Sequence, residues 1–414
     1  MRNTTKKTAQ DGSISYLIRV SAGYALDGTQ IKKSMTWKPS QGMTPRQIER
    51  ELEHQCVMFE EKVKNGFALD GNIRFSDYAE RFMSVKELSL KCRVEYEGLL
   101  VRINQGIGHI RLDKLQPMHL QELYKELRTI KSRRTGEGLS DKTILHHHRL
   151  ISSILSQACK ERLIERNIAS RDFMDAPKVK RKEPAYLDDI QAREVVELLH
   201  SYDDIRVKTS VLLLIYTGMR RGELCGMEWG DIDYTNSVIH IRRATQYIRD
   251  KGLITKEPKN ESSIRSLKVP LEVLNLLADY RQWQLAQQQL CGDKWQESIT
   301  AWFVDGSSSK LQTVANSRIF TTEDGGLISP DTINFWIEKL RERYNLPQFT
   351  PHSLRHTNIT LQIAAGVSIR TIANRAGHSQ ASTTTNIYAH AIKTADEIAS
   401  QALDDMLTPR KRKA

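Results

Sequence analysis

The chain has 414 residues, 39% of them hydrophobic, and its 62 lysines and arginines outnumber 50 aspartates and glutamates, for a formal net charge of +12. Its longest uninterrupted apolar run, VLLLIY at 211–216, is far shorter than the ~20 residues that span a bilayer, and the basic N-terminus lacks the apolar segment of a secretory signal. Five cysteines are scattered without a CxxC pair, which argues against a zinc ribbon or a disulfide framework and suits a reducing cytoplasm.

A chain of this length is expected to form two or three domains, and the charge is spread unevenly along it. Residues 71–186 contain 23 basic and 15 acidic residues, whereas residues 187–414 contain 28 and 27. A basic excess concentrated in one half indicates a nucleic-acid partner. On charge alone, a merely soluble basic protein is an equally good interpretation.

The first 70 residues have the pattern of a small sheet followed by a helix. ISYLIRV (14–20) and IKKSMTW (31–37) alternate and are rich in β-branched residues, and Asp27–Gly28 between them is a turn signal. TPRQIERELEHQCVMFEEKVKNG (44–66) follows, with a Thr-Pro start, helical spacing and a terminal glycine.

The middle of the chain is expected to be all-helical and to end in a linker. Apolar residues recur at three- and four-residue spacing in FSDYAERFM (75–83), VEYEGLLVRI (94–103), HLQELYKEL (119–127) and KTILHHHRLISSILSQACKERLI (142–164). PKVKRKEP (177–184) then has a proline at each end and four cations between them, which predicts an exposed basic linker.

Three adjacent histidines, His146, His147 and His148, raise the question of a metal site. On a helix, successive side chains point about 100° apart, so the three cannot converge on one ion. We interpret them as a solvated or DNA-facing surface.

Residues 187–414 are expected to form a mostly helical block. One strand-like interruption is predicted, SVIHIRR (237–243), followed by a lysine-rich hairpin and SLKVP (266–270). The fold class predicted for the whole chain is mainly α with small β elements.

The stretch VKTSVLLLIYTGMRRGELCGMEW (207–229) begins as a buried helix that Thr217–Gly218 should break. Arg220 follows at the edge of this apolar core, and it needs an anionic partner because arginine does not lose its charge. That partner is either Glu223, three residues further on, or a bound anion.

The stretch TPHSLRHTN (350–358) places His352, Arg355 and His356 within about one helical turn. His352 and Arg355 are three residues apart, so they share a helix face. The i, i+4 spacing of His352 and His356 suits zinc, but a zinc-protease helix has Glu directly after the first histidine, where this chain has Ser353. Guanidinium groups beside a histidine fit a phosphate better.

The last informative stretch is AGHSQASTTTNIYAH (376–390). It places Gly377–His378 in an expected turn, with Tyr388 ten residues after His378. Taken alone, the succession of helix, glycine turn and Ser/Thr start also suits a helix-turn-helix.

Taken together, TGMRRGEL, HSLRH, AGH and NIYAH occur in an order that resembles the tyrosine recombinases, or phage-type integrases, of bacterial phages and conjugative transposons. The resemblance covers essentially the whole chain. It implies an arm-site DNA-binding domain over 1–70 (a small three-stranded sheet plus a helix), a helical core-site-binding domain over 73–175, a basic linker over 176–186, and a mostly helical catalytic domain over 187–414 with a small β-hairpin sheet, a C-terminal helix and a basic tail.

The resemblance also implies the catalytic residues, which are Arg220, Lys259, His352, Arg355, His378 and Tyr388. Tyr388 matches the nucleophile, and Glu223 matches the acidic residue that supports Arg220. Lys259 has the family's spacing to Ser263 and Arg265, although Asn260 replaces the usual threonine and Lys256 is an alternative.

The implied function is a site-specific DNA recombinase that integrates and excises a mobile element through a 3′-phosphotyrosyl intermediate, with no metal and no nucleotide cofactor. Arg220 and Arg355 would supply fixed positive charge as the pentacoordinate phosphorus forms. His352 would act as base for Tyr388, whose pKa is ordinarily ~10, Lys259 would act as general acid, and a histidine at 378 would bond a phosphate oxygen. A type IB-like topoisomerase and a sequence-specific DNA-binding regulator are the alternatives.

Double-stranded DNA with core-type and arm-type sites is the implied partner. The resemblance further implies a homo-tetramer on DNA, a Holliday junction, and exchange of a C-terminal helix (395–407); an excisionase, a DNA-bending protein and no membrane are expected. The expected location is the bacterial cytoplasm, with the nucleoid. The residues predicted to bind DNA are Lys178, Lys180, Arg181, Lys182, Arg19, Lys32 and Lys33.

Overall fold

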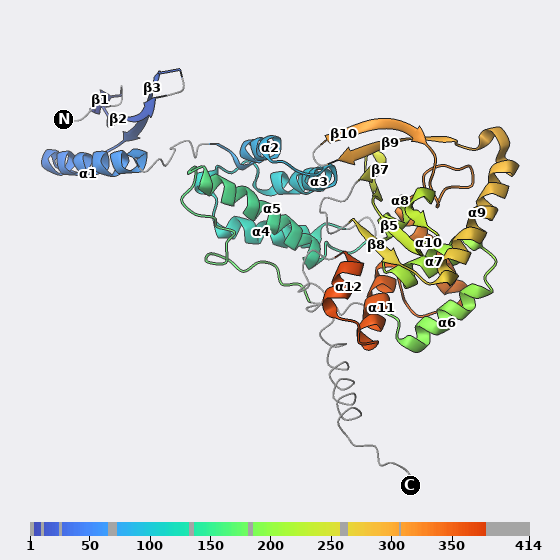
Figure 1. Cartoon of the computed structure of the whole chain (residues 1–414). Coiled ribbons are helices and arrows are strands. Elements are labelled where there is room, and N and C mark those ends of the chain that lie inside the picture. The colour runs from blue at the N-terminus through green and yellow to red at the C-terminus, as the bar shows by residue number, and fades with distance from the viewer. Residues whose placement is uncertain are drawn as a thin grey trace, which may run out of the picture. The chain divides into compact units, whose positions relative to one another are not determined.

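The computed structural model describes residues 4–9, 12–24, 27–64, 73–131, 136–180, 185–256, 264–305 and 308–377 (Figure 1). The chain divides into two compact units, Met1–Arg181 and Lys182–Ala414. Helices dominate and the sheets are small, so the predicted fold class is confirmed. None of the helices in these described ranges is long and apolar enough to cross a membrane.

The chain begins with an antiparallel sheet that packs on one helix. The strands are β1 (Thr4–Thr8), β2 (Ile14–Tyr24) and β3 (Gln30–Trp37), in the order β1-β2-β3, and the helix is α1 (Pro45–Lys64). Residues alternate between the two faces of a sheet, and Ile18 lies on the face that packs against Leu52 and Phe59 of α1. The third strand implied by the family resemblance is β1, whose polar sequence TTKKT has no apolar alternation of its own.

A helical domain follows, as predicted. Its helices are α2 (Phe75–Val85), α3 (Leu90–Ile107), α4 (Pro117–Thr129) and α5 (Asp141–Lys160). The Ser89 and Ser140 side chains accept hydrogen bonds from backbone N–H groups at the starts of α3 and α5, which is why these helices begin there. Their apolar faces meet in one core, which includes Phe75, Ile103, Leu120 and Ile151.

The three adjacent histidines of α5 do not form a solvated surface, so that prediction was wrong for two of them. His147 is 0% exposed and His148 is 6% exposed, and only His146 faces solvent. The His148 Nδ1 lies 2.8 Å from the Tyr124 hydroxyl on α4, and the His147 Nδ1 lies 2.8 Å from the Thr143 carbonyl oxygen. Burial lowers the pKa of both imidazoles. Helical periodicity gives the angle between side chains but not the face that a neighbouring helix will cover.

The second unit is built around a buried helix. Its helices are α6 (Asp189–His200), α7 (Ile205–Thr217), α8 (Arg221–Gly226), α9 (Leu271–Cys291), α10 (Pro330–Tyr344), α11 (Pro351–Ala364) and α12 (Ile369–Ala376). The VLLLIY run lies in α7, which packs against α6, α9, α10 and α11. α7 is therefore the central element of this unit, and α12 packs on α11 and strand β8 (Arg265–Lys268) instead.

Two small sheets complete this unit. One has the order β4-β5-β8, and the other has the order β10-β9-β7-β6, with β7 and β9 parallel. The strands are β4 (Ile232–Asp233), β5 (Val238–Ile241), β6 (Ala244–Ile248), β7 (Gly252–Lys256), β8 (Arg265–Lys268), β9 (Ser298–Asp305) and β10 (Ser308–Ala315). The strands predicted between 237 and 270 are present, but β9 and β10 were missed. The β10 sequence SSKLQTVA is largely exposed and has little apolar alternation to reveal it.

Candidate active site

Arg220 is held at the junction of two helices. Gly218 ends α7 in the left-handed conformation, with φ +62°, and Arg220 is the residue that precedes α8. The Arg220 backbone N–H and its Nη1 both donate to the Glu223 carboxylate, each at 2.8 Å. The pairing of Arg220 with Glu223 expected from the i, i+3 spacing is therefore present, while the Arg220 side chain remains 44% exposed.

Two glycines fix α8 against the sheet. A Cβ on Gly222 would come within 2.7 Å of the Thr245 carbonyl oxygen of β6, and a Cβ on Gly226 would come within 2.9 Å of the Arg243 carbonyl oxygen. Only glycine allows the helix backbone to approach the strand this closely. The glycines of RRGELCG therefore determine the position of α8, the helix that Arg220 precedes.

Arg355 lies near the start of α11, four residues after Pro351. The Thr350 side chain accepts a hydrogen bond from the Ser353 N–H, and Pro351 occupies the first helical position, which together explain the start of this helix. Arg355 is 2% exposed, and its guanidinium donates to the Gly218 carbonyl oxygen at 2.8 Å and to the Ala376 carbonyl oxygen. α11 is thus bonded to the end of α7 and the end of α12.

Three guanidinium groups converge on consecutive carbonyl oxygens at the end of α12. Arg265 Nε donates to the Arg375 oxygen at 2.7 Å, and Arg355 donates to the Ala376 oxygen. Arg220 Nη2 donates to the oxygen of the next residue, Gly377, at 3.0 Å. Consecutive Cα atoms are about 3.8 Å apart, so one helix end brings Arg220 and Arg355 close together. The carbonyl end of a helix carries partial negative charge, which stabilises these cations.

Glu223 is shared between two arginines. Arg265 donates to its Oε1 at 3.1 Å and its Oε2 at 2.7 Å, in addition to the bonds from Arg220. Burial alone would raise the pKa of Glu223, but the bonds and charges of Arg265 and Arg220 outweigh it and hold the pKa below its ordinary value. The carboxylate is therefore ionised, and it faces two positive charges.

A cleft of about 710 Å³ opens beside these arginines, and His352 stands at it. Partial desolvation, then the charges of Arg355 and Arg220, lower the pKa of His352 below its ordinary value of 6.5. Its ring centroid lies 4.5 Å from that of buried His356, edge to face. The described residues that line the cleft are Arg220, Arg221, Asn334, Ile337, Glu338, Arg341, Phe349, Thr350, Pro351, His352 and Arg355.

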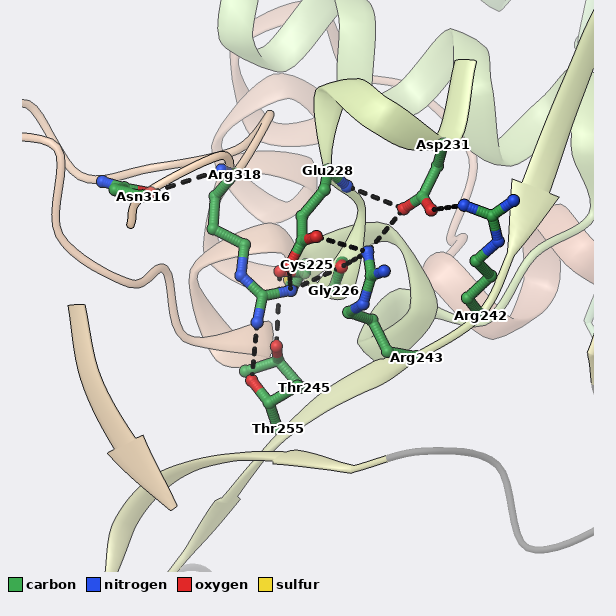
Figure 2. A network of polar contacts seen from close by, with 10 residues as sticks. All are labelled: Cys225, Gly226, Glu228, Asp231, Arg242, Arg243, Thr245, Thr255, Asn316 and Arg318. Atoms are coloured by element: carbon green, nitrogen blue, oxygen red, sulfur yellow. Dashed lines mark hydrogen bonds and ion pairs between the residues drawn. The ribbon is translucent and has the colours of Figure 1, made fainter. Parts of the chain in front are cut away.

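A partly buried ionic network lies at the C-terminal end of α8 (Figure 2). Arg318, only 1% exposed, donates to the Gly226 carbonyl oxygen at the end of α8 and to the Thr255 hydroxyl of β7 at 2.8 Å. Glu228 lies between Arg318 and Arg243, at 3.5 Å and 3.0 Å. The network therefore joins α8, which follows Arg220, to β7, the strand that precedes the segment with Lys259.

The cations predicted to bind DNA fall into different settings. In the first sheet, Lys33 is paired with Val20, on the side of Ile18 and α1, whereas Arg19 and Lys32 lie on the opposite, open face. Lys178 and Lys180 are exposed in an irregular segment. The remaining predicted residues lie outside the described part of the chain, and they are Arg181, Lys182, Lys259, His378 and Tyr388.

Arg265 is the site residue that the sequence analysis did not assign. Its spacing to Lys259 follows the family pattern, but nothing in that spacing shows that Arg265 reaches Glu223. In the part of the chain that the structure describes, no three histidine, cysteine or acidic side chains are grouped as metal ligands.

Comparison with known proteins connects this geometry to a family. The model of the phage integrase family matches residues 186–394, which is half of the chain. A protein named tyrosine recombinase XerC-like, from Caldanaerobacter subterraneus subsp. tengcongensis, is 24% identical over 97% of this chain and 99% of its own length. The ICEBs1 integrase of Bacillus subtilis is 23% identical over 69% of this chain and 71% of its own length.

Among solved structures, the chain is similar to that of the Tn1549 transposon integrase in complex with a circular intermediate DNA. The TM-score is 0.63 at 19% sequence identity, over 80% of this chain and 99% of that one. At this identity the similarity concerns the fold.

Proposed function

This chain belongs to the phage integrase family and is a tyrosine site-specific recombinase, and from that premise we propose that it integrates and excises a mobile element by cutting and rejoining DNA with Tyr388. The observation that carries the assignment of the site is that Arg220, His352 and Arg355, from distant parts of the sequence, line one cleft. Two of the four motifs, those that contain Arg220 and the pair of His352 and Arg355, therefore support this assignment.

The arginines supply the electrostatic part of the proposed reaction. A DNA phosphodiester is a monoanion, and attack by an oxygen places more negative charge on the oxygens of the pentacoordinate phosphorus. Arg220 and Arg355 are held by carbonyl oxygens of one helix end, so their charges are in place before the substrate binds. Preorganised charge of this kind costs no reorganisation at the moment of reaction.

The proposed covalent step exchanges one phosphoester for another. The Tyr388 oxygen bonds to phosphorus, the bond from phosphorus to the 5′-oxygen breaks, and the 3′ side stays attached to the tyrosine. His352, whose neutral form is favoured at the cleft, takes the phenol proton, and Lys259 gives a proton to the departing 5′-oxygen. His378 donates a hydrogen bond to a phosphate oxygen. A 5′-hydroxyl then reverses the step, and neither ATP nor a metal enters the balance.

The first test is formation of a covalent adduct. A duplex with a nick close to the cut site loses a short 5′-hydroxyl fragment after cleavage, which traps the protein on DNA. The wild-type chain is expected to form an adduct resistant to denaturants, and Tyr388→Phe is expected to bind the same DNA without forming one. An adduct that persists in Tyr388→Phe would assign the nucleophile elsewhere. Joining of two duplexes, rather than relaxation of supercoils alone, separates a recombinase from a topoisomerase.

The rest of the chain is proposed to hold the DNA. The open face of the first sheet, with Arg19 and Lys32, is suited to an arm-type site, and α1 covers the other face. The helical domain over 73–175 and the linker cations, including Lys178 and Lys180, would contact core-site phosphates. Replacing linker lysines should weaken binding to all sequences alike and reduce its salt dependence.

The assembly is also a proposal. We expect a tetramer that joins two duplexes through a Holliday junction, with the segment 395–407 docking on a neighbouring subunit. An excisionase and a DNA-bending protein would determine whether the element is integrated or excised. The expected location of the reaction is the bacterial cytoplasm, at the nucleoid. Deletion of 395–407 should leave DNA binding intact and abolish the tetramer in sedimentation on paired sites.

A further inference from the structure

We propose that Arg265 is a positioning residue of this reaction: it balances the charge of Glu223 and fixes the end of α12, so that the charge of Arg220 remains available to the scissile phosphate. This inference rests on the function proposed above. Nothing in the family match or in the motif spacing assigns Arg265 such a role.

The described hydrogen bonds of Arg265 join it to α12 and to Glu223. Its Nε donates to the Arg375 carbonyl oxygen at 2.7 Å, and its two Nη atoms donate to the two oxygens of Glu223. The side chain is 6% exposed, and Arg265 is absent from the described residues that line the cleft. Among the described residues, Arg265 therefore contacts Glu223 and the end of α12, and we propose that it acts through them.

Charge balance shows why a second arginine is needed beside Glu223. An ion pair of Arg220 with Glu223 alone would be neutral, and it would offer little attraction to an anion. With Arg265 in a two-pronged contact on the same carboxylate, the three groups carry a net charge of +1. Arg220 is also the exposed member of the three, at 44% against 6% for each of the other two. The surplus charge therefore faces the cleft.

Arg265 also positions Arg220 and Arg355 through the end of α12. Arg265 bonds the carbonyl oxygen of Arg375, and the next two oxygens, of Ala376 and Gly377, accept bonds from Arg355 and Arg220. A Cβ on Gly377 would lie 3.0 Å from Arg265 Nη1, which shows how tightly this turn is packed on Arg265. Loss of Arg265 would free the turn and both of its catalytic donors together.

The test compares two DNA substrates that differ in charge at the scissile phosphorus. One is the natural phosphodiester, and the other is a methylphosphonate, in which a methyl group replaces one charged oxygen. On the phosphodiester, Arg265→Gln should slow single-turnover adduct formation about 10- to 100-fold, less than the ~10²–10³-fold typical of removing a direct donor. On the methylphosphonate the loss should shrink to about 3-fold or less, because both the ground state and the transition state carry one negative charge less than those of the phosphodiester. Binding of the uncut DNA should change by less than about 3-fold.

Arg265→Lys and Arg206→Gln complete the set. Lysine restores the positive charge without the two-pronged contact, so Arg265→Lys should recover part of the rate on the phosphodiester. If Arg265→Gln fails to fold, Arg265→Lys still tests the role of the charge, because its longer side chain keeps the turn packed. Arg206 makes a similar two-pronged contact with Asp204, away from α12, and its variant should behave as wild type on both substrates.

Two results would contradict the proposed role of Arg265. Equal losses on both substrates would mean that Arg265 supports the fold alone, and an unchanged rate would mean that it has no role. If the wild-type chain forms no adduct while it binds DNA, the proposed function fails and this inference fails with it. An adduct in the wild type that Tyr388→Phe abolishes keeps the proposed function whatever Arg265 does.

Discussion

Arg220 and Arg355 donate hydrogen bonds to neighbouring carbonyl oxygens of one turn, those of Gly377 and Ala376. The end of α12 is therefore a common support for the two cations of the proposed reaction. This support makes the cations sensitive to changes in residues that do not touch DNA.

Arg355→Lys should lose most of the reaction rate while it still binds DNA. A lysine cannot reach the Gly218 and Ala376 oxygens together, so adduct formation should fall ~10²–10³-fold. The unpaired carbonyl groups should also lower the free energy of unfolding by about 1–3 kcal/mol. Single-turnover kinetics and chemical denaturation measure the two effects. Arg221→Gln, which removes an exposed pair with Asp331 at the same cleft, should change stability by less than about 1 kcal/mol. A full rate in Arg355→Lys would contradict the proposed role.

Gly377→Ala should reduce activity more than its backbone strain explains. Gly377 has φ +67° and packs on Arg265, whereas Gly366 has φ +73° and open space around its Cβ position. Both alanine variants should lose about 1 kcal/mol of stability from the left-handed backbone. Only Gly377→Ala should also displace Arg265 and slow adduct formation. Matched rates for the two variants would show that this contact is unimportant.

The rate of adduct formation should stay high as the pH falls to 6.5 and decline only at a lower pH. The neutral imidazole of His352 is the proposed base, and desolvation and the nearby arginines lower its pKa below 6.5. Protonation therefore inactivates the base only at a pH below that ordinary value. A pH profile of single-turnover rates measures this, and His352→Gln should remove the acidic limb. A midpoint at or above 6.5 would exclude His352 as this base.

Stability should also fall in acid because of His356. Burial, then the neighbouring His352 and Arg355, lower the pKa of His356 to about 4. The unfolded chain, with a histidine pKa of ~6.5, therefore binds the proton more readily than the folded chain, and unfolding is favoured as the pH falls from about 6.5 to about 4. Protonation of His356 is expected to lower the free energy of unfolding by at most about 3 kcal/mol, and solvent screening reduces this loss. Denaturation at several pH values should show a smaller slope for His356→Gln than for wild type, and identical slopes would contradict the prediction.

Arg318→Met and Arg242→Gln should differ greatly in stability, although both remove an arginine from one network. Arg318 is 1% exposed and supports the end of α8, so its loss leaves Glu228 less compensated and the Gly226 oxygen without that donor. The expected loss is about 3–5 kcal/mol. Arg242 is 49% exposed opposite Asp231, and its loss should cost less than about 1 kcal/mol. Thermal and chemical unfolding of the isolated variants measure the difference, and equal losses would contradict it.

Local signals in the sequence predicted the elements that carry the site. Thr350 and Pro351 mark the start of α11, and Gly218 marks the end of α7, because capping depends on residues close in the chain. The Arg220–Glu223 pair is equally local. The helices of the middle domain followed from their apolar spacing.

The features that were missed depend on contacts between distant residues. The burial of His148 requires Tyr124 of α4, and the helical spacing of α5 does not contain that information. Arg265 is adjacent in sequence to neither Glu223 nor Arg375, so a motif read along the chain cannot show the contact. Strand β10 is stabilised mainly by pairing with β9, and its own residues give a weak pattern.

The position of α12 has a consequence for protein synthesis. Chains are made from the N-terminus, and domains fold in that order. A nascent chain that already displays its cationic first unit still lacks residues 375–377, whose oxygens gather Arg265, Arg355 and Arg220. The arrangement of these three cations therefore depends on a helix that is made after all three arginines, and it forms only once α12 has been added to the chain.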